Sequence, residues 1–454
     1  MSETDDKTQL PDLFPSADYA RARPPRRIAV IGSGVSGLVA SHVLSRHDEV
    51  TLFEADPRLG GHAHTHDVDV GGKTIAVDSG FIVHNRRTYP TLIRLFDELG
   101  VATIDSEMSL SIRDDELGVE YCGGTGVAGM LPNRAALRPR HVKMLADVPR
   151  FHRAARKQLA RADATSDVIN SPETLGEFLD RHRFGQHFRR TFVIPLVAAV
   201  WSTEPGKALE YPAEFLFRFL DNHGMLTVLG SPQWRTVAGG SRNYVDSVAA
   251  GIAHVRTGEP VHEVMPGRGG VRVDTAAGGD TFDAVVVATH SDQALRMLGA
   301  PTPAQTEILS ALPYQRNEMI MHTDTSILPR APRARAAWNH LSSAPLRITS
   351  EGEGPQQEVI TYDMNRLQHL PVPGETRILV TLNGRELVDP EKILRSAEYA
   401  HPLYTPESVA ARARLAEIDS DRVVFAGAYH GWGFHEDGAA SGLRAAEKLG
   451  GRWS

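Results

Sequence analysis

Three glycines next to a short apolar run constrain the fold of this chain most strongly. Residues 27–31 (RIAVI) predict a buried parallel strand, and residues 35–46 (VSGLVASHVLSR) predict a helix that packs on a sheet. Gly32, Gly34 and Gly37 have the spacing GSGVSG at the junction. This spacing allows a tight turn, close approach of a phosphate and close packing of helix on strand. The segment therefore predicts a phosphate site at the N-terminus of a helix.

A carboxylate at the end of the next predicted strand narrows the class of ligand that the site can bind. Residues 49–54 (EVTLFE) end in Glu54, 20 residues after Gly34, where a carboxylate can accept hydrogen bonds from ribose hydroxyls. Ser33 and Ser36 lie inside the glycine turn. The strand, turn, helix and acidic residue together predict an adenine dinucleotide. FAD and NAD share this pattern, so it leaves both open.

The residues that follow resemble a flavoprotein family. The run EADPRLGG, residues 54–61, resembles the motif extension of the amine oxidase and phytoene desaturase superfamily, which NAD dehydrogenases do not ordinarily carry. Residues 77–83 (VDSGFIV) and 425–447 (FAGAYHGWGFHEDGAASGLRAAE) resemble its flavin-ring and C-terminal segments. The resemblance implies FAD. With the glycine turn it gives these cofactor-binding candidates: Gly32, Ser33, Gly34, Ser36, Gly37, Glu54, Arg58, Gly60, Gly61, His62, Gly80, Phe81, Val261, Gly427, Glu436, Asp437 and Gly438.

The expected fold class is α/β, with a Rossmann-type FAD-binding domain of the amine oxidase (GR2) type and an interleaved α+β substrate domain. At 454 residues the chain is too long for one ordinary core. We expect an FAD-binding domain from residues 25–85, 236–300 and 413–454, and a substrate-binding domain from 86–235 and 301–412. Residues 1–24 are polar, acidic and proline-bearing, and we expect a disordered leader there.

Local patterns predict several elements of the substrate domain. Residues 89–100 (YPTLIRLFDELG) predict a helix that starts at Pro90 and stops at Gly100. The stretch from there to about residue 235 is mainly helical in pattern, and Thr174 with Glu177 forms a capping-box signature. Segments between about 310 and 412 predict a second sheet.

The nearest resemblance is to a bacterial subgroup of predicted NAD/FAD-binding proteins. It rests on residues 84–101 (HNRRTYPTLIRLFDELGV), 232–245 (PQWRTVAGGSRNYV) and 429–438 (YHGWGFHEDG). Relatives of this subgroup form the N-terminal part of plant cyclopropane-fatty-acid synthases and accompany bacterial fatty-acyl methyltransferases. The resemblance implies an FAD-dependent dehydrogenase or desaturase of lipid acyl chains, including methylated ones, and a fatty-acyl methyltransferase as partner.

Two departures keep other functions open. His62 stands where the amine oxidases usually have arginine, and Ala428 where they have glutamate. A flavin amine oxidase is therefore the second hypothesis. A flavin- or lipid-binding scaffold that supports a methyltransferase without turnover is the third.

Aromatic and histidine side chains near the two flavin motifs are the catalytic candidates. The predicted residues are His435, Trp432, Tyr429 and His64, with His435 as the first choice for acid/base work. A helix starting near Gly438 would direct its positive dipole to the flavin. His62, His64 and His66 alternate as metal ligands on a strand can. The glycine pair explains this loop as flavin-proximal, so we predict no metal site.

Composition excludes several classes of protein. The one cysteine, Cys122, rules out an intramolecular disulfide and the thiol pair of flavin disulfide reductases, and it indicates a reducing, cytoplasmic location. The monoamine oxidases of the resembled superfamily carry their flavin-linking cysteine in the C-terminal motif, and Cys122 is far from it, so the resemblance implies non-covalent FAD. No second G-x-G-x-x-G follows a strand, so we expect no separate NADPH domain.

One segment is strongly basic in a chain of net charge −7. Residues 134–161 carry +8, so the remainder carries −15. With Leu137, Val142, Leu145, Val148, Phe151 and Leu159 interleaved, the segment is typical of an amphipathic helix on the anionic inner face of a membrane, or of a solvated helix face. The overall charge gives no sign of nucleic-acid binding. The longest apolar stretch, Val193 to Trp201, is far short of the ~20 residues of a membrane helix.

Overall fold

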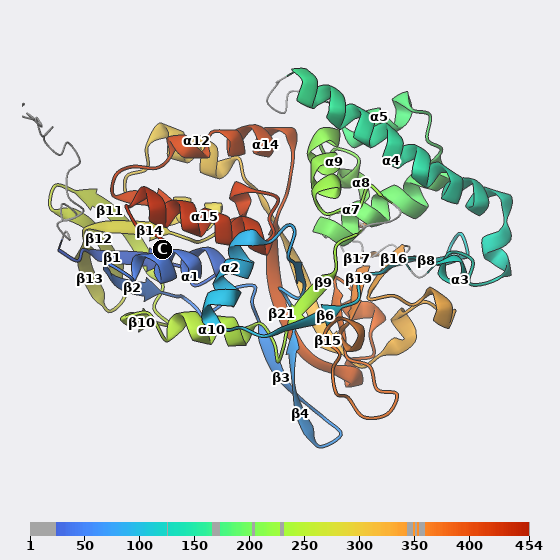
Figure 1. Ribbon diagram of the computed structural model, residues 1–454, viewed down its shortest axis with the longest axis horizontal. Helices are drawn as coiled ribbons and strands as arrows, with labels where there is room; N and C mark the ends of the chain where they lie inside the picture. Colours follow the sequence, from blue (N-terminus) through green and yellow to red (C-terminus); the bar gives the residue numbers. More distant parts are fainter. Residues whose placement is uncertain are drawn as a thin grey trace, which may run out of the picture.

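Five parallel strands form the sheet that carries the glycine-rich turn. In the computed structural model their order is β10 (His254–Arg256), β2 (Glu49–Phe53), β1 (Arg27–Ile31), β14 (Ala284–Val287) and β22 (Val423–Phe425). Three distant parts of the chain thus supply one sheet (Figure 1). The structure describes residues 24–453 except 125, 166–172, 202–204, 228–230, 343–347, 350–351 and 354–358. Apart from residue 24, the predicted leader lies outside the described residues.

Alternate residues of these strands enter two apolar cores, as the period of a strand requires. On one face, Val30 and Leu52 pack with α1 (Val35–Leu44), α2 (Pro90–Leu99), α10 (Arg242–Ala249) and α15 (His435–Lys448). On the other, Ile31 and Phe53 pack with α11 (Ser291–Met297), α12 (Pro303–Ser310) and a three-stranded sheet of β11 (Val261–Gly267), β12 (Gly270–Thr275) and β13 (Gly278–Phe282). Burial on both faces is typical of doubly wound parallel sheets, so the expected fold class is confirmed.

A second, seven-stranded sheet lies beside this domain (Figure 1). Its predicted strands between residues 310 and 412 are present, but two further strands come from residues 110–123, where the pattern indicated mainly helix. Leu110 aligns with Trp338 in a parallel pair, a partner that no local periodicity announces. The order is β21 (Ile393–Pro402), β15 (Tyr314–His322), β20 (Leu379–Leu382), β19 (Val359–Asp363), β16 (Trp338–Ser342), β7 (Leu110–Asp114) and β8 (Val119–Gly123).

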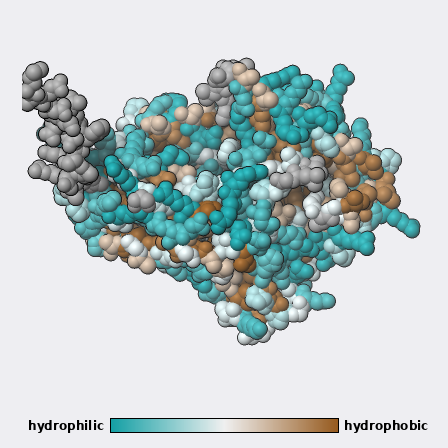
Figure 2. Space-filling model, viewed as in Figure 1, coloured by the Kyte–Doolittle hydropathy of each residue, from teal (hydrophilic) through white to brown (hydrophobic). Residues whose placement is uncertain are grey.

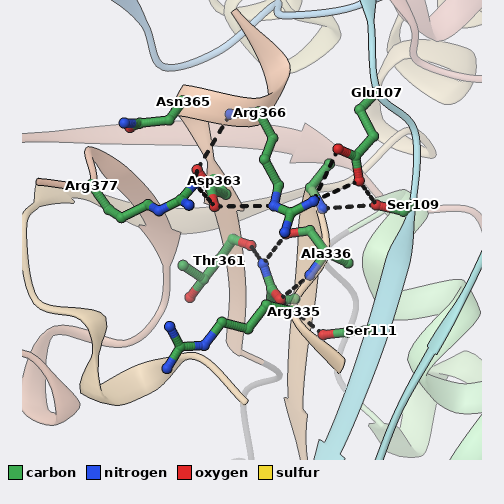
Figure 3. Close-up of polar contacts among 12 residues, drawn as sticks. Glu107, Ser109, Ser111, Arg335, Ala336, Thr361, Asp363, Asn365, Arg366 and Arg377 are labelled. Atoms are coloured by element: carbon green, nitrogen blue, oxygen red, sulfur yellow. Dashed lines mark hydrogen bonds and ion pairs between the residues drawn. The ribbon is translucent and has the colours of Figure 1, made fainter. Parts of the chain in front are cut away.

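A partly buried polar network joins these separated strands (Figure 3). The Asp363 carboxylate accepts from Arg377 at 3.0 Å and pairs with Arg366 at 3.4 Å, and Arg366 also bonds to Glu107 at 3.0 Å. The Ser111 hydroxyl donates to the Asn339 side chain at 2.9 Å across the β7–β16 pair. These groups bond mainly to one another, so the network links the strands of the sheet.

Helices pack against the β7–β8 edge of the seven-stranded sheet and form an aromatic core there. They are α4 (Pro139–Thr165), α5 (Leu175–Arg181), α7 (Ile194–Trp201) and α9 (Ala213–Asn222) (Figure 1). The predicted capping box at α5 is confirmed, because Thr174 Oγ1 accepts from the Glu177 N–H at 3.2 Å and the Glu177 carboxylate accepts from the Thr174 N–H at 2.9 Å. The predicted helix after Tyr89 is confirmed as α2, with Gly100 left-handed at φ 67°.

The remaining strands and helices are short. None of the described helices combines the length and apolar character needed to cross a bilayer. The strands are β3 (Thr65–Val70), β4 (Lys73–Asp78), β5 (His84–Asn85), β6 (Thr103–Ser106), β9 (Trp234–Val237), β17 (Ile348–Thr349) and β18 (Gly352–Glu353). The helices and turns are α3 (Val127–Met130), η2 (Arg134–Leu137), α6 (Gln186–Phe188), η3 (Arg189–Val193), α8 (Pro205–Ala208), η4 (Thr325–Ile327), η5 (Pro332–Ala334), α13 (Met364–Leu367), η6 (Arg385–Leu387), η7 (Pro390–Lys392), α14 (Pro406–Ala413), η8 (Leu415–Glu417) and η9 (Ala428–His430).

Candidate cofactor and active site

The three glycines of the turn have three different environments. A β-carbon on Gly37 would lie 1.8 Å from the Gly32 carbonyl oxygen, and one on Gly32 would lie 2.7 Å from the Ala288 carbonyl oxygen. Gly34 is different, because no described protein atom lies within 4 Å of its β-carbon position. It caps α1 without a side-chain hydrogen bond, and the first turn contains no acidic residue. Open space beside unpaired helix N–H groups fits a pyrophosphate.

Glu54 lies where the ribose of such a ligand is expected. Its Oε2 accepts from the Ser33 N–H at 2.9 Å and from the Ser33 hydroxyl at 2.5 Å, and its Oε1 accepts from the Asp56 N–H at 2.9 Å. The Glu259 N–H donates to the Glu54 carbonyl at 3.0 Å, which brings the start of β11, with Val261, to the same end of the sheet. The carboxylate is thus held beside the turn and half-buried.

The Gly60–Gly61 loop folds back onto the turn. The Gly60 N–H donates to the Ser33 carbonyl at 3.1 Å, and a β-carbon on Gly61 would lie 3.1 Å from the Gly34 Cα. The Arg58 guanidinium donates to the Gly61 carbonyl at 2.8 Å. The extension motif therefore closes the phosphate turn from one side.

The loop at Gly80 packs against the backbone of His62, which follows the Gly60–Gly61 pair. A β-carbon on Gly80 would lie 2.1 Å from the His62 carbonyl oxygen, which also accepts from the Phe81 N–H at 2.8 Å. The His62 ring is half-buried, and its Nε2 has no partner among the described residues. A buried imidazole nitrogen without a partner is suited to a bound group beside the glycine turn.

The C-terminal helix rests directly on the helix that follows the turn. A β-carbon on Gly438 would lie 2.6 Å from Val35 Cγ1. Ser441 Oγ accepts from the Gly427 N–H at 2.9 Å and lies 3.4 Å from Ser36 Oγ. Helix α15 starts at His435, three residues before the predicted Gly438, because Glu436 and Asp437 complete its first turn.

Both acids of that first turn are engaged by backbone N–H groups. The Glu436 carboxylate accepts from Thr91 at 2.9 Å and from Leu92 at 3.0 Å, at the N-terminus of α2, and burial raises its pKa. Asp437 accepts from the Phe434 N–H at 2.9 Å, and burial raises its pKa to about 6. Glu436 therefore links α15 to α2 and Asp437 caps α15 itself, and the contact of either carboxylate with the cofactor stays a prediction.

The catalytic candidates near the C-terminus do not share one site. Tyr429 is 1% exposed and lies in the core behind the parallel sheet. Trp432 points the other way, toward Phe215 and Phe219 of α9, and its carbonyl accepts from the Trp201 indole at 3.0 Å. The sequence placed Tyr429 and Trp432 in one aromatic wall. Tyr429 lies within the η9 turn and Trp432 lies after its end, and the two side chains enter different cores.

The His435 side chain is packed against neighbouring aromatic side chains. Its ring stacks on Phe81 with centroids 3.8 Å apart, and its Nε2 lies 2.6 Å from the Tyr244 hydroxyl. Burial lowers the pKa of His435 to about 3. The imidazole is therefore neutral at physiological pH. Its predicted acid/base role is untested.

A second group of histidines surrounds His62. The rings of His401 and His290 lie 5.4 and 6.2 Å from it, and Tyr399 lies 5.1 Å away. Burial is the main cause that lowers the pKa of His62 well below its usual range, of His401 to about 4, and also of His290. The sequence analysis missed His290, Tyr399 and His401. Only the alternation of Tyr399 and His401 along a strand could have indicated them.

His64 belongs to a hydrogen-bonded chain. Its Nδ1 lies 2.9 Å from the Tyr399 hydroxyl, which lies 2.6 Å from Ser79 Oγ, and His66 Nε2 lies 2.8 Å from that same oxygen. Burial lowers the pKa of His64 to about 3 and of His66 to about 4. In the described part of the chain, no group of three or more His, Cys, Asp or Glu side chains could hold a metal ion.

A glycine turn on a doubly wound sheet, a carboxylate beside it and an adjoining second sheet define a dinucleotide-binding oxidoreductase fold. The family model described as flavin-containing amine oxidoreductase matches residues 35–397. The chain belongs to this family, and its cofactor is FAD.

Curated relatives match over limited stretches. A flavin-dependent L-tryptophan oxidase from Lentzea aerocolonigenes is 43% identical over 60 residues, 13% of each chain. The mitochondrial protoporphyrinogen oxidase of Nicotiana tabacum is 25% identical over 199 residues, 42% of this chain and 36% of that protein. The chain thus covers well under half the length of these relatives.

Solved structures match over nearly the whole length and show the fold. The fatty acid isomerase from P. acnes that produces CLA has a TM-score of 0.65 at 16% identity, over 94% of this chain and 99% of that one. Cyclohexylamine oxidase from Brevibacterium oxydans IH-35A has a TM-score of 0.66 at 16% identity, over the same shares.

Proposed function

We propose that this FAD-dependent oxidoreductase is a dehydrogenase or desaturase of a lipid acyl chain. The observation that carries the proposal is that no carboxylate is among the groups that act most strongly on His62. After burial, these groups are His401, His290, His435 and Arg58, and all four lower its pKa. Burial favours the neutral form of the three imidazoles, and the Arg58 guanidinium is positive, so an ammonium substrate would find no counter-charge among them, whereas a neutral chain with an ester or carboxylate end would be tolerated.

The adjoining sheet supports an apolar substrate. Met319, Met321 and Leu382 share one apolar cluster with the nucleotide-domain residues, and the half-buried Trp338 and Tyr362 pack against that cluster. An unactivated carbon chain needs such surroundings, since water would compete for the cofactor.

When bound, FAD supplies the acceptor for a hydride. A side chain of the protein must take up the proton released from the neighbouring carbon of the substrate. We assign this task to His64, which is neutral and bonded to the Tyr399 hydroxyl, with Ser79 and His66 next in the chain of hydrogen bonds. His62 would bond to the cofactor or orient it.

Similarity to other proteins agrees with this substrate class. One structural neighbour is a fatty acid isomerase by its description, and relatives of the bacterial subgroup resembled above accompany fatty-acyl methyltransferases. We extend the proposal to methylated acyl chains and to such a methyltransferase as partner.

Anaerobic mixing of the holoprotein with acyl phospholipids tests the proposal. Unsaturated or methyl-branched chains should bleach the flavin absorbance at about 450 nm. The variant His64→Gln should keep its FAD but reduce it about 100-fold more slowly. Bleaching by amines, with peroxide released in air, would replace the proposal by the second candidate, an amine oxidase, which the L-tryptophan oxidase match favours. No bleaching by any donor would favour the scaffold hypothesis.

FAD attachment and electron entry can be tested on the same material. Cys122 is buried on β8, at the edge of the seven-stranded sheet opposite β21, whose Tyr399 and His401 flank His62. We propose non-covalent FAD, so acid precipitation should release the yellow colour. NADPH alone should not reduce the flavin rapidly.

A further inference from the structure

Exposed apolar side chains gather at one end of the molecule. Among the described residues, the three most exposed large hydrophobic side chains are Val127 (69%), Leu137 (61%) and Val142 (49%), from α3, η2 and the start of α4. Figure 2 shows the matching hydrophobic patch at the right-hand edge, over α3 and the beginning of α4. We call these three residues the apolar tip.

The rest of the basic segment packs differently from the sequence expectation. Phe151 and Leu159 are buried in the aromatic core, and Leu145 and Val148 are partly buried against it. The apolar face of α4 is therefore occupied by the protein. Only Leu137 and Val142 of the six predicted membrane-facing residues are exposed, and Val127 from outside the segment joins them.

Exposed cations adjoin the apolar tip, since Arg134, Arg138, Arg140 and Lys143 neighbour Leu137 and Val142 along η2 and the start of α4. All nine Lys and Arg side chains of residues 134–161 are exposed. The one acid of the segment, Asp147, pairs with Arg150 at 2.8 Å, farther along α4. Arg134 and Lys143, beside the tip, have no carboxylate within ion-pairing distance in the described part of the chain.

We propose that the apolar tip and its basic border dock the enzyme onto an anionic phospholipid bilayer. The three side chains would enter the headgroup and acyl boundary, and the cations would bind lipid phosphates. The remainder of the chain carries −15, so an anionic surface favours an orientation with this end toward the bilayer. A second copy of the chain is a poor occupant, because a two-fold pair would bring two +8 segments together.

Vesicle flotation tests the proposal with the intact holoprotein. Phosphatidylcholine vesicles that contain phosphatidylglycerol should carry the protein upward, and pure phosphatidylcholine vesicles should not. Arg134→Gln and Lys143→Gln should each weaken binding about fivefold at low salt. The triple variant Val127→Ser, Leu137→Ser, Val142→Ser should lose binding.

A matched control uses apolar residues exposed elsewhere. Ile104 (37%) and Val255 (38%) lie on β6 and β10, and Ile104→Ser with Val255→Ser should leave flotation unchanged. Equal binding to both vesicle types, or a triple variant that still floats, would overturn the proposal. The proposal would also be overturned if light scattering showed a dimer that the triple variant abolishes and the wild-type protein did not bind vesicles.

The readout needs no turnover, so it is independent of the proposed substrate. A variant that no longer floats should still reduce its flavin with detergent-dispersed lipid if the acyl proposal holds.

Discussion

Gly442 of α15 lies so close to Ser36 of α1 that a β-carbon on the glycine would fall 2.1 Å from the serine carbonyl oxygen. The two residues are far apart in sequence, yet their contact sets how the last helix lies on the helix of the phosphate turn.

Gly442→Ala should therefore push α15 away from α1. We expect a loss of about 1–3 kcal/mol in the free energy of unfolding, together with weaker FAD retention. Thermal melting and flavin content of the purified protein measure both. Gly269→Ala is the matched control, because no described atom lies within 4 Å of its β-carbon position. Equal melting of the two variants would contradict this packing.

Gly34→Ala should separate cofactor binding from folding. The protein leaves room for the new methyl group, so the apoprotein should melt within about 0.5 kcal/mol of wild type. The methyl group would occupy the space that a pyrophosphate needs, so FAD affinity should fall at least tenfold by titration. Gly37→Ala should instead destabilise the apoprotein, because the new β-carbon would lie 1.8 Å from the Gly32 carbonyl oxygen.

Glu436→Ala should act on stability more than on the flavin. Removing the carboxylate leaves the Thr91 and Leu92 N–H groups without their acceptor, at a cost of about 1.5–3 kcal/mol in chemical denaturation. The folded fraction should keep its FAD and its visible spectrum. A variant that folds normally but is colourless would assign Glu436 to the cofactor.

His84 predicts a pH dependence of stability. Burial lowers its pKa from 6.5 to about 4, so between these values the unfolded chain binds a proton that the folded protein excludes. Stability is then lost as the pH falls below 6.5. Both ring nitrogens lack partners among the described residues, and Phe81 and Phe96 adjoin the ring.

His84→Phe should thus stabilise the protein, and more at pH 5 than at pH 7, as urea unfolding at both values would measure. Several other buried histidines, including His401 and His435, have lowered pKa values and act in the same direction. Asp78 acts in the opposite direction, since burial raises its pKa to about 6. An equal effect of the substitution at both pH values would show that His84 does not titrate as described.

The sequence was informative wherever a contact is local. The glycine turn, Glu54 at the next strand end and the Thr174–Glu177 box each involve residues within one supersecondary unit, and their spacing is fixed by helix and strand geometry. The fold class and FAD followed from these local motifs and the family resemblance.

Tertiary structure alone decided the pairings between distant segments. Strand β7 pairs with β16, Glu436 accepts hydrogen bonds from α2, and the His401 ring lies beside His62. These contacts depend on sheet order and helix packing, which are set by the burial of whole surfaces that periodicity does not identify. The basic segment shows the same limit. Its charge could be counted from the sequence, but which of its apolar side chains reach solvent depended on the aromatic core that covers the others.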